Sequence, residues 1–231
     1  MESRLAARPE RLKLESDLFR FWSSLDDGAR YHPADDMVLR HAEHHFNLQC
    51  LPAAYYGPLK NAPVVLLFLS PGFDISDLDH ANSIEGQTWY ASQRSGTAPL
   101  PTEQDHAALF QWWTGICRPF RLDPDQIRHK LAILNLGAYK SVDFRDWHML
   151  SALPSSRKAL DWVQSVLFPQ AEGGERVVVC LRSAKHWGLR TAEGGPYGEA
   201  LFAPSVTRAG HMLHGDLRER IIRVIQARLR G

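Results

Sequence analysis

The turn that follows the first long apolar segment carries residue types suited to chemistry. Residues 64–69 are all apolar, and the next five are Ser70, Pro71, Gly72, Phe73 and Asp74. A carboxylate such as Asp74 can orient a water molecule as a general base, although Asp and Ser are also favoured at the start of a helix. Phe73 is suited either to stacking on a flat ligand or to core packing. Ser70 is not expected to be a nucleophile, because no G-x-S-x-G motif surrounds it.

Three later apolar segments also end in polar turns. Segment 131–136 contains Asn135, segment 176–181 precedes Ser183, and segment 200–203 precedes Pro204, Ser205 and Arg208, with His211 a little further on. The amide of Asn135 offers both a donor and an acceptor, which suits recognition of a base edge, but an Asn there can also simply cap a turn. Backbone amides at the Ser183 and Ser205 turns are candidates for phosphate contacts, with charge added by Arg208.

The elements that must position these turns are four short apolar strands separated by helices. This alternation predicts a three-layer α/β/α domain around a central four-stranded, mainly parallel sheet. Ligands of such sheets bind beyond the carboxyl ends of the strands. We expect helices over residues 14–25, 33–46, 102–117 with Thr102 as cap, 155–168 and 213–229, and an irregular region over 71–102. Residues 1–61 are interpreted as a helical extension packed on the core, and residues 62–231 as the α/β domain.

Composition narrows the function classes without selecting one. The net charge of +1 over 231 residues does not favour nucleic-acid binding. A local basic face is nevertheless compatible with a net charge near zero. Three distant cysteines without a C-x-x-C motif indicate neither a disulfide framework nor an iron–sulfur or other metal site, so we expect no cofactor. His41, His44 and His45 are spaced to bind a metal on one helix face, but a solvated face is favoured. With no signal peptide and no apolar stretch of membrane length, a cytoplasmic location is expected.

Taken in order, the strand ends resemble the motifs of the uracil-DNA glycosylase superfamily over residues 62–228. The resemblance is carried by Leu69-Ser70-Pro71-Gly72, Leu134-Asn135-Leu136, Arg182-Ser183-Ala184 and Ala203-Pro204-Ser205. It implies that the first turn shapes a base pocket, that Asn135 reads the edge of a flipped base, and that the Pro204-Ser205 loop enters the minor groove. The expected function is therefore binding of DNA or a nucleobase and hydrolysis of an N-glycosidic bond in damaged or modified DNA.

Two departures from the family pattern bear on catalysis. Ser70 stands where the family usually has an acidic residue or Asn, and Ala203 stands where it often has His. Asp74 would then orient the water, and His211 would help the leaving group. The alternative is a binding module that kept the fold, lost the chemistry and recognises a nucleotide or a partner. An unrelated α/β hydrolase would need a nucleophile with a base beside it, and no strong one is found.

Overall fold

Five strands of the described residues form one mixed sheet in the order β1-β3-β2-β4-β5. The computed structural model describes residues 17–189 and 197–231. The strands are β1 (Tyr55–Tyr56), β2 (Val64–Phe68), β3 (Leu131–Asn135), β4 (Val177–Cys180) and β5 (Leu201–Phe202). The four later strands pair in parallel, whereas β1 pairs antiparallel with β3. The α/β class is confirmed, but the expectation of four strands was wrong. A two-residue edge strand hidden in a Pro- and Gly-marked connection adds the fifth.

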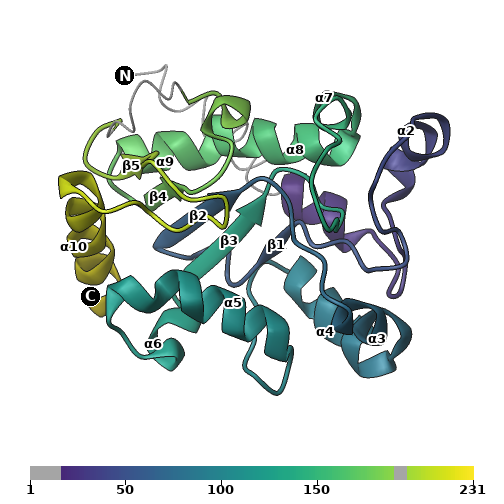
Figure 1. Ribbon diagram of the computed structural model, residues 1–231, viewed down its shortest axis with the longest axis horizontal. Helices are drawn as coiled ribbons and strands as arrows, with labels where there is room; N and C mark the ends of the chain where they lie inside the picture. Colours follow the sequence, from purple (N-terminus) through teal and green to yellow (C-terminus); the bar gives the residue numbers. More distant parts are fainter. Residues whose placement is uncertain (1–16, 190–196) are drawn as a thin grey trace, which may run out of the picture.

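Helices cover both faces of this sheet (Figure 1). One face packs against residues 17–23, which are helical, and against a nearly continuous run of helices. That run consists of α7 (Met149–Ala152), α8 (Pro154–Trp162), the π-helical η3 (Val163–Leu167) and α9 (Phe168–Glu172). The other face packs against α4 (Ile84–Arg94), α5 (Ala107–Cys117), α6 (Pro124–Arg128) and α10 (Asp216–Arg230). Burial on both faces explains why the central strands read as continuous apolar runs.

Several helices differ from the sequence expectation for identifiable reasons. The region 71–102 is not irregular, because it holds α3 (Ser76–Asn82) and α4, the latter capped by Ser83, whose side chain accepts a hydrogen bond from the amide of Gly86. Helix α5 begins at Ala107 rather than at residue 102, because the His106 ring provides the cap. The helix after α8 continues through Pro169, which lies in the first turn of α9, where a missing N–H costs little.

The N-terminal part of the chain is closely joined to the sheet. Segment η1 (Pro33–Asp35) leads into α2 (Asp36–His41), which is shorter than expected. His44 and His45 therefore lie beyond the helix, and the three histidines do not share one helical face. The division of the chain at residue 61 stays a prediction, and β1 lies on its N-terminal side. No helix within the described ranges has the length and apolarity to cross a membrane.

The parallel register aligns the segments that leave β2 and β3. Phe68 lies opposite Asn135, and the amides of Leu136 and Gly137 donate to the carbonyl groups of Phe68 and Leu69. A further parallel bridge joins Gly72 to Ser141. The two turns therefore leave the sheet side by side, and side chains from both line the same cavity.

Candidate functional site

A cavity of about 430 Å³ lies at the carboxyl edge of the sheet. Its size is within the range of small-molecule sites in proteins. All four segments that follow the parallel strands contribute to its wall, and β1 and the start of α5 complete it. The lining comprises Tyr56, residues 68–74, Asp77, His106, Ala108, Leu109, Trp112, Asn135, residues 140–144, Arg182, Arg208 and Ala209.

Asn135 is the amide that lines this cavity, and it is 3% exposed. Its Nδ2 donates a hydrogen bond of 2.9 Å to the carbonyl group of Ala53. Its Oδ1 accepts no hydrogen bond from residues 17–189 or 197–231. The amide is thus held by one backbone contact while an acceptor and a second N–H stay available, as recognition of a donor–acceptor edge requires.

Aromatic side chains form much of the remaining wall. Phe68 and Trp112 meet at an angle of 62° with ring centroids 5.0 Å apart, and Phe73 and Phe144 also line the cavity. Phe73 is half-buried and belongs to none of the core clusters of the described residues. A flat ligand would therefore find apolar ring surface beside the amide of Asn135.

Asp74 lines the same cavity and also shapes the start of α3. Its Oδ1 accepts hydrogen bonds from the backbone amide of Ser76 at 2.9 Å and from the Ser76 hydroxyl at 2.6 Å. These bonds lower the pKa of Asp74, so the exposed carboxylate is ionised at neutral pH. The two interpretations of this residue are physically compatible, because one oxygen stabilises the turn while the other remains available.

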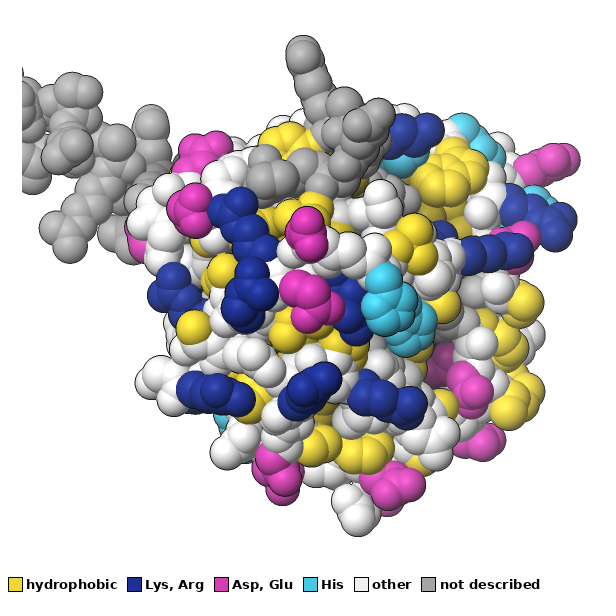
Figure 2. Space-filling view, turned by 60° about the vertical axis from the view of Figure 1, so that its left-hand side comes forward, with side chains coloured by type: hydrophobic (Ala, Val, Ile, Leu, Met, Phe, Trp, Pro, Cys, Tyr) yellow, Lys and Arg dark blue, Asp and Glu magenta, His cyan; other side chains and the backbone are white. Residues whose placement is uncertain are grey.

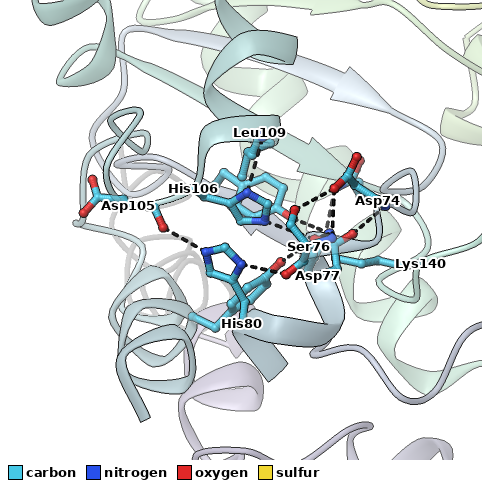
Figure 3. Close-up of polar contacts among 12 residues, drawn as sticks. Asp74, Ser76, Asp77, His80, Asp105, His106, Leu109 and Lys140 are labelled. Carbon is cyan, nitrogen blue, oxygen red and sulfur yellow. Dashed lines mark hydrogen bonds and ion pairs between the residues drawn. The ribbon is translucent and has the colours of Figure 1, made fainter. Parts of the chain in front are cut away.

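A buried charged cluster, formed by Asp77, His106 and Lys140, lies in the wall of the cavity (Figure 3). Asp77 Oδ1 is 2.9 Å from Lys140 Nζ and 3.0 Å from His106 Nε2. The three side chains come from α3, from the cap of α5 and from the turn after β3. Each side chain is at most 5% exposed. The cluster is therefore shielded from bulk water on every side except the one that borders the cavity.

Hydrogen bonding and burial fix the ionisation of the cluster. Burial alone would raise the pKa of Asp77, but the hydrogen bond from His106 and the charge of Lys140 lower it to about 2. Burial lowers the pKa of His106. His106 Nδ1 accepts from the amide of Leu109 at 3.4 Å, so Nε2 carries the proton and donates to Asp77. Burial opposes the charge of Lys140, yet the Tyr56 hydroxyl and Asp77 raise its pKa. The cluster therefore contains a carboxylate, an ammonium group and a neutral imidazole.

The imidazole ring of His106 is supported by a second histidine, His80, on the face against which His80 stacks. The ring of His80 stacks on that of His106 at 4.0 Å between centroids. The two nitrogens of His80 lie 2.8 Å and 3.0 Å from the carbonyl oxygens of Ser76 and Asp105 (Figure 3). Since His80 is tied to both α3 and the loop before α5, the stacked pair links the two elements that supply Asp77 and His106.

The structure brings together most, but not all, of the residues predicted from sequence. Those that line the cavity are Ser70, Pro71, Gly72, Phe73, Asp74, Asn135 and Arg208. His211, Ser183, Pro204 and Ser205 are absent from that lining. His211 instead borders a separate cavity of about 180 Å³.

The hairpin after β5 explains this separation. Val206 bridges Met212, and the amide of Leu213 donates to the carbonyl group of Ser205. Its tip, Arg208 and Ala209, reaches the strand-end cavity, while His211 lies on the returning arm. Arg208 forms an ion pair of 2.6 Å with Asp143, which also lines the cavity.

Basic residues on the face that includes α10 are interspersed with acidic ones. The face that includes α10 shows Lys and Arg side chains with Asp and Glu between them (Figure 2). On α10, Arg220 pairs with Glu199 at 2.9 Å, and Arg218 pairs with Glu219 at 2.5 Å. This distribution is typical of a solvated, mixed-charge surface.

Sequence reasoning missed the charged cluster as a unit. His106 falls inside the helix expected over residues 102–117, and neither Asp77 nor Lys140 is among the residues predicted to form a site. A signal in the sequence was Lys140 itself, because it lies in the turn that follows the buried strand β3, at the edge of the sheet where ligands bind. Among the described residues, no group of three or more His, Cys, Asp or Glu side chains could hold a metal ion.

Comparison with known proteins leaves the site to be interpreted from its own geometry. No protein-family model matches the chain, and no curated protein matches it.

Proposed function

We propose that the protein binds a nucleobase in the strand-end cavity and hydrolyses the N-glycosidic bond of a damaged or modified base in DNA. The observation that carries the proposal is the fixed amide of Asn135 in a cavity of about 430 Å³ whose wall is partly aromatic. The strand-end motifs noted in the sequence support it, because Ser70, Pro71, Gly72 and Asn135 lie on the same wall. The finer assignment, a uracil-DNA glycosylase-like fold, is part of this proposal.

Recognition would use the unpaired half of the amide. Oδ1 can accept from a ring N–H, and the second hydrogen of Nδ2 can donate to a neighbouring carbonyl oxygen, which together distinguish uracil from cytosine. Phe73 would stack on the extruded base. Extrusion is required, because the target atom of a stacked base is out of reach of such a pocket.

Bond cleavage would use the free oxygen of Asp74. A water molecule attacks the sugar C1′ while the C1′–N bond breaks, and the bonding electrons leave with the base. Asp74 Oδ2 accepts the proton of the water as a general base. The base departs with negative charge, and fixed positive groups at the cavity would stabilise that charge in the transition state.

One set of observations favours a second candidate, a binding module without catalysis. Asp74 Oδ1 already serves Ser76, Ser70 is a weak base, and His211 lies outside the cavity. Such a module would still hold a base against Asn135. It would bind a nucleotide or modified DNA without releasing the base.

Oligonucleotides carrying uracil, hypoxanthine, xanthine or an alkylated base provide the test, in single- and double-stranded form. Purified protein is incubated with each, and abasic sites are counted after alkaline cleavage. We expect release of at least one base, and loss of release in Asn135→Ala. Asn61→Ala is the matched control, because Asn61 is an exposed amide outside the cavity lining.

The outcomes separate the two candidates. Binding that weakens with salt, without base release, would support the module. If the protein neither releases a base from any of the oligonucleotides nor binds any of them in a salt-dependent way, both candidate functions would be rejected.

A further inference from the structure

The ion pair between Asp77 and Lys140 lies in the cavity wall, and the proposed hydrolysis does not say which positive group contacts the base. Buried ion pairs are weak contributors to stability, since desolvation offsets their attraction. Ionisable groups held charged in a cleft are instead candidates for function. We infer that Lys140 selects the ligand by charge: it binds an oxo-base that departs as an anion and disfavours N-alkylated bases that carry a positive charge. This inference rests on the proposed function and narrows its substrate class.

The hydrogen bonds of the pair leave the cation, not the anion, with spare capacity. Asp77 Oδ1 accepts hydrogen bonds from Lys140 Nζ and His106 Nε2, and the Tyr90 hydroxyl donates to the same oxygen at 3.4 Å. Asp77 Oδ2 receives the backbone amide of Asp74 at 2.8 Å. The carboxylate is therefore well supplied with donors, and it has little left to offer a ligand.

Lys140 has one donor left. An ammonium group carries three N–H bonds. One is directed to Asp77 Oδ1 at 2.9 Å and one to the Tyr56 hydroxyl at 3.3 Å. The third meets no acceptor among residues 17–189 and 197–231. Because Lys140, Asp77 and Tyr56 all line the cavity, a ligand acceptor is the natural partner of that N–H.

The groups packed around Lys140 keep its ammonium group in place, and the Asp77 carboxylate at 2.9 Å balances its charge while leaving one N–H unused. Asp77 faces it from α3, Tyr56 from β1, and Tyr90 from α4, where the ammonium lies 5.8 Å from the ring centroid. His106 faces the pair from the cap of α5 and is neutral, and burial raises the pKa of the nearby Cys50 thiol to about 11. Asp77 is thus a positioning residue for Lys140.

This placement discriminates between the two classes of base. An oxo-base such as uracil or hypoxanthine gains negative charge on its oxygen and nitrogen atoms as the glycosidic bond breaks. A fixed ammonium group binds that charge more strongly in the transition state than in the ground state, which is the condition for catalysis. A cationic base such as 7-methylguanine leaves as a neutral molecule, so a fixed ammonium group gives its departure no stabilisation.

The test compares release rates for a series of bases. Oligonucleotides carry uracil, 5-fluorouracil, hypoxanthine or 7-methylguanine, and each is treated with wild type, Lys140→Met, Lys140→Arg and the double variant Asp77→Asn with Lys140→Met. Lys60→Met is the control, since Lys60 is exposed and does not line the cavity. The double variant removes both charges and keeps the assay valid if Lys140→Met alone does not fold.

We expect wild type to prefer oxo-bases, and Lys140→Met and the double variant to lose about tenfold to a hundredfold in their release. Release should also depend more steeply on the acidity of the leaving base, so that 5-fluorouracil loses less than uracil. Lys140→Arg should retain part of the preference, and Lys60→Met all of it. A structural role alone would not change the dependence on leaving-group acidity.

The contrary results separate the inference from the proposed function. Efficient release of 7-methylguanine by wild type, or an unchanged preference in the double variant, would overturn the inference and leave the function standing. If no base is released, equilibrium binding of free xanthine, which readily forms an anion, is compared with that of 7-methylguanosine. Equal affinities would overturn the inference, and absence of binding by either would overturn both proposals.

Discussion

Two buried polar networks include neighbouring residues of one short segment, and they differ in their access to the strand-end cavity. Tyr139 and Lys140 are consecutive residues after β3. Lys140 joins Asp77 and His106 at the cavity. Tyr139 donates to Asp35 Oδ2, and the amide of Ser155 donates to Asp35 Oδ1 at 3.0 Å. Each network thus has a carboxylate within 2% exposure at its centre.

The difference is access. In the Asp35 network the Tyr139 hydroxyl also accepts from the amide of His32 at 3.2 Å, and Asp35, Tyr139 and His32 are absent from the lining of the strand-end cavity. In the Asp77 network a donor is left over, and it borders a cavity. The Asp35 carboxylate has no access to the strand-end cavity, and its donors tie η1 to the turn after β3 and to α8. The Asp77 carboxylate holds a cation whose unused N–H borders the cavity, which is the basis for proposing a ligand there.

The largest expected effect comes from removing one charge of the Asp77 network. Lys140→Met should lower the free energy of unfolding by about 3–5 kcal/mol, because it leaves the Asp77 carboxylate buried without its cation. Adding Asp77→Asn should recover much of this loss, because both charges are then gone. Urea denaturation of the two single variants and the double variant measures the coupling. Additive losses would show that the two side chains do not act as a pair.

Breaking the Asp35 network should cost stability and leave the ligand site intact. Asp35→Ala removes the acceptor of Tyr139 and of the Ser155 amide, and we expect a loss of about 2–3 kcal/mol from two unsatisfied buried donors. Base selectivity should be unchanged. Asp36→Ala is the neighbouring control, because its solvent-accessible ion pair with Arg40 should contribute little to stability. Altered selectivity in Asp35→Ala would contradict the division between the networks.

The smallest effect is a pH dependence shared by the two networks. Burial lowers the pKa of both His106 and His32 below 6.5. Below that pH the unfolded chain binds more protons than the folded chain, so stability should fall as the pH drops through 6.5 towards the folded pKa values. His106→Gln and His32→Gln should each make this fall shallower, as followed by thermal unfolding between pH 7.5 and roughly pH 5. Of the two variants, only His106→Gln should change ligand affinity.

The sequence predicted the four parallel strands and the carboxyl edge at which the cavity lies, but not β1, because central parallel strands must be apolar throughout. The apolar composition of residues 64–69 and 131–136 indicated buried strands, and Asn135 was the one polar residue within these two segments. The charged cluster was not predictable in the same way. Asp77, His106 and Lys140 come together only when α3 and the α5 cap pack against the turn after β3, and no local pattern encodes that packing. The alternation that sends Tyr139 and Lys140 to different networks likewise depends on the path of the chain.

The two strands that border the sheet, β1 and β5, have only two residues each. Short borders present few unpaired amides and carbonyl groups to the backbone of another molecule. The sheet can therefore hold a continuous apolar centre without templating the growth of intermolecular β-structure. This arrangement favours solubility at high concentration, even though the central strands, if exposed, would aggregate.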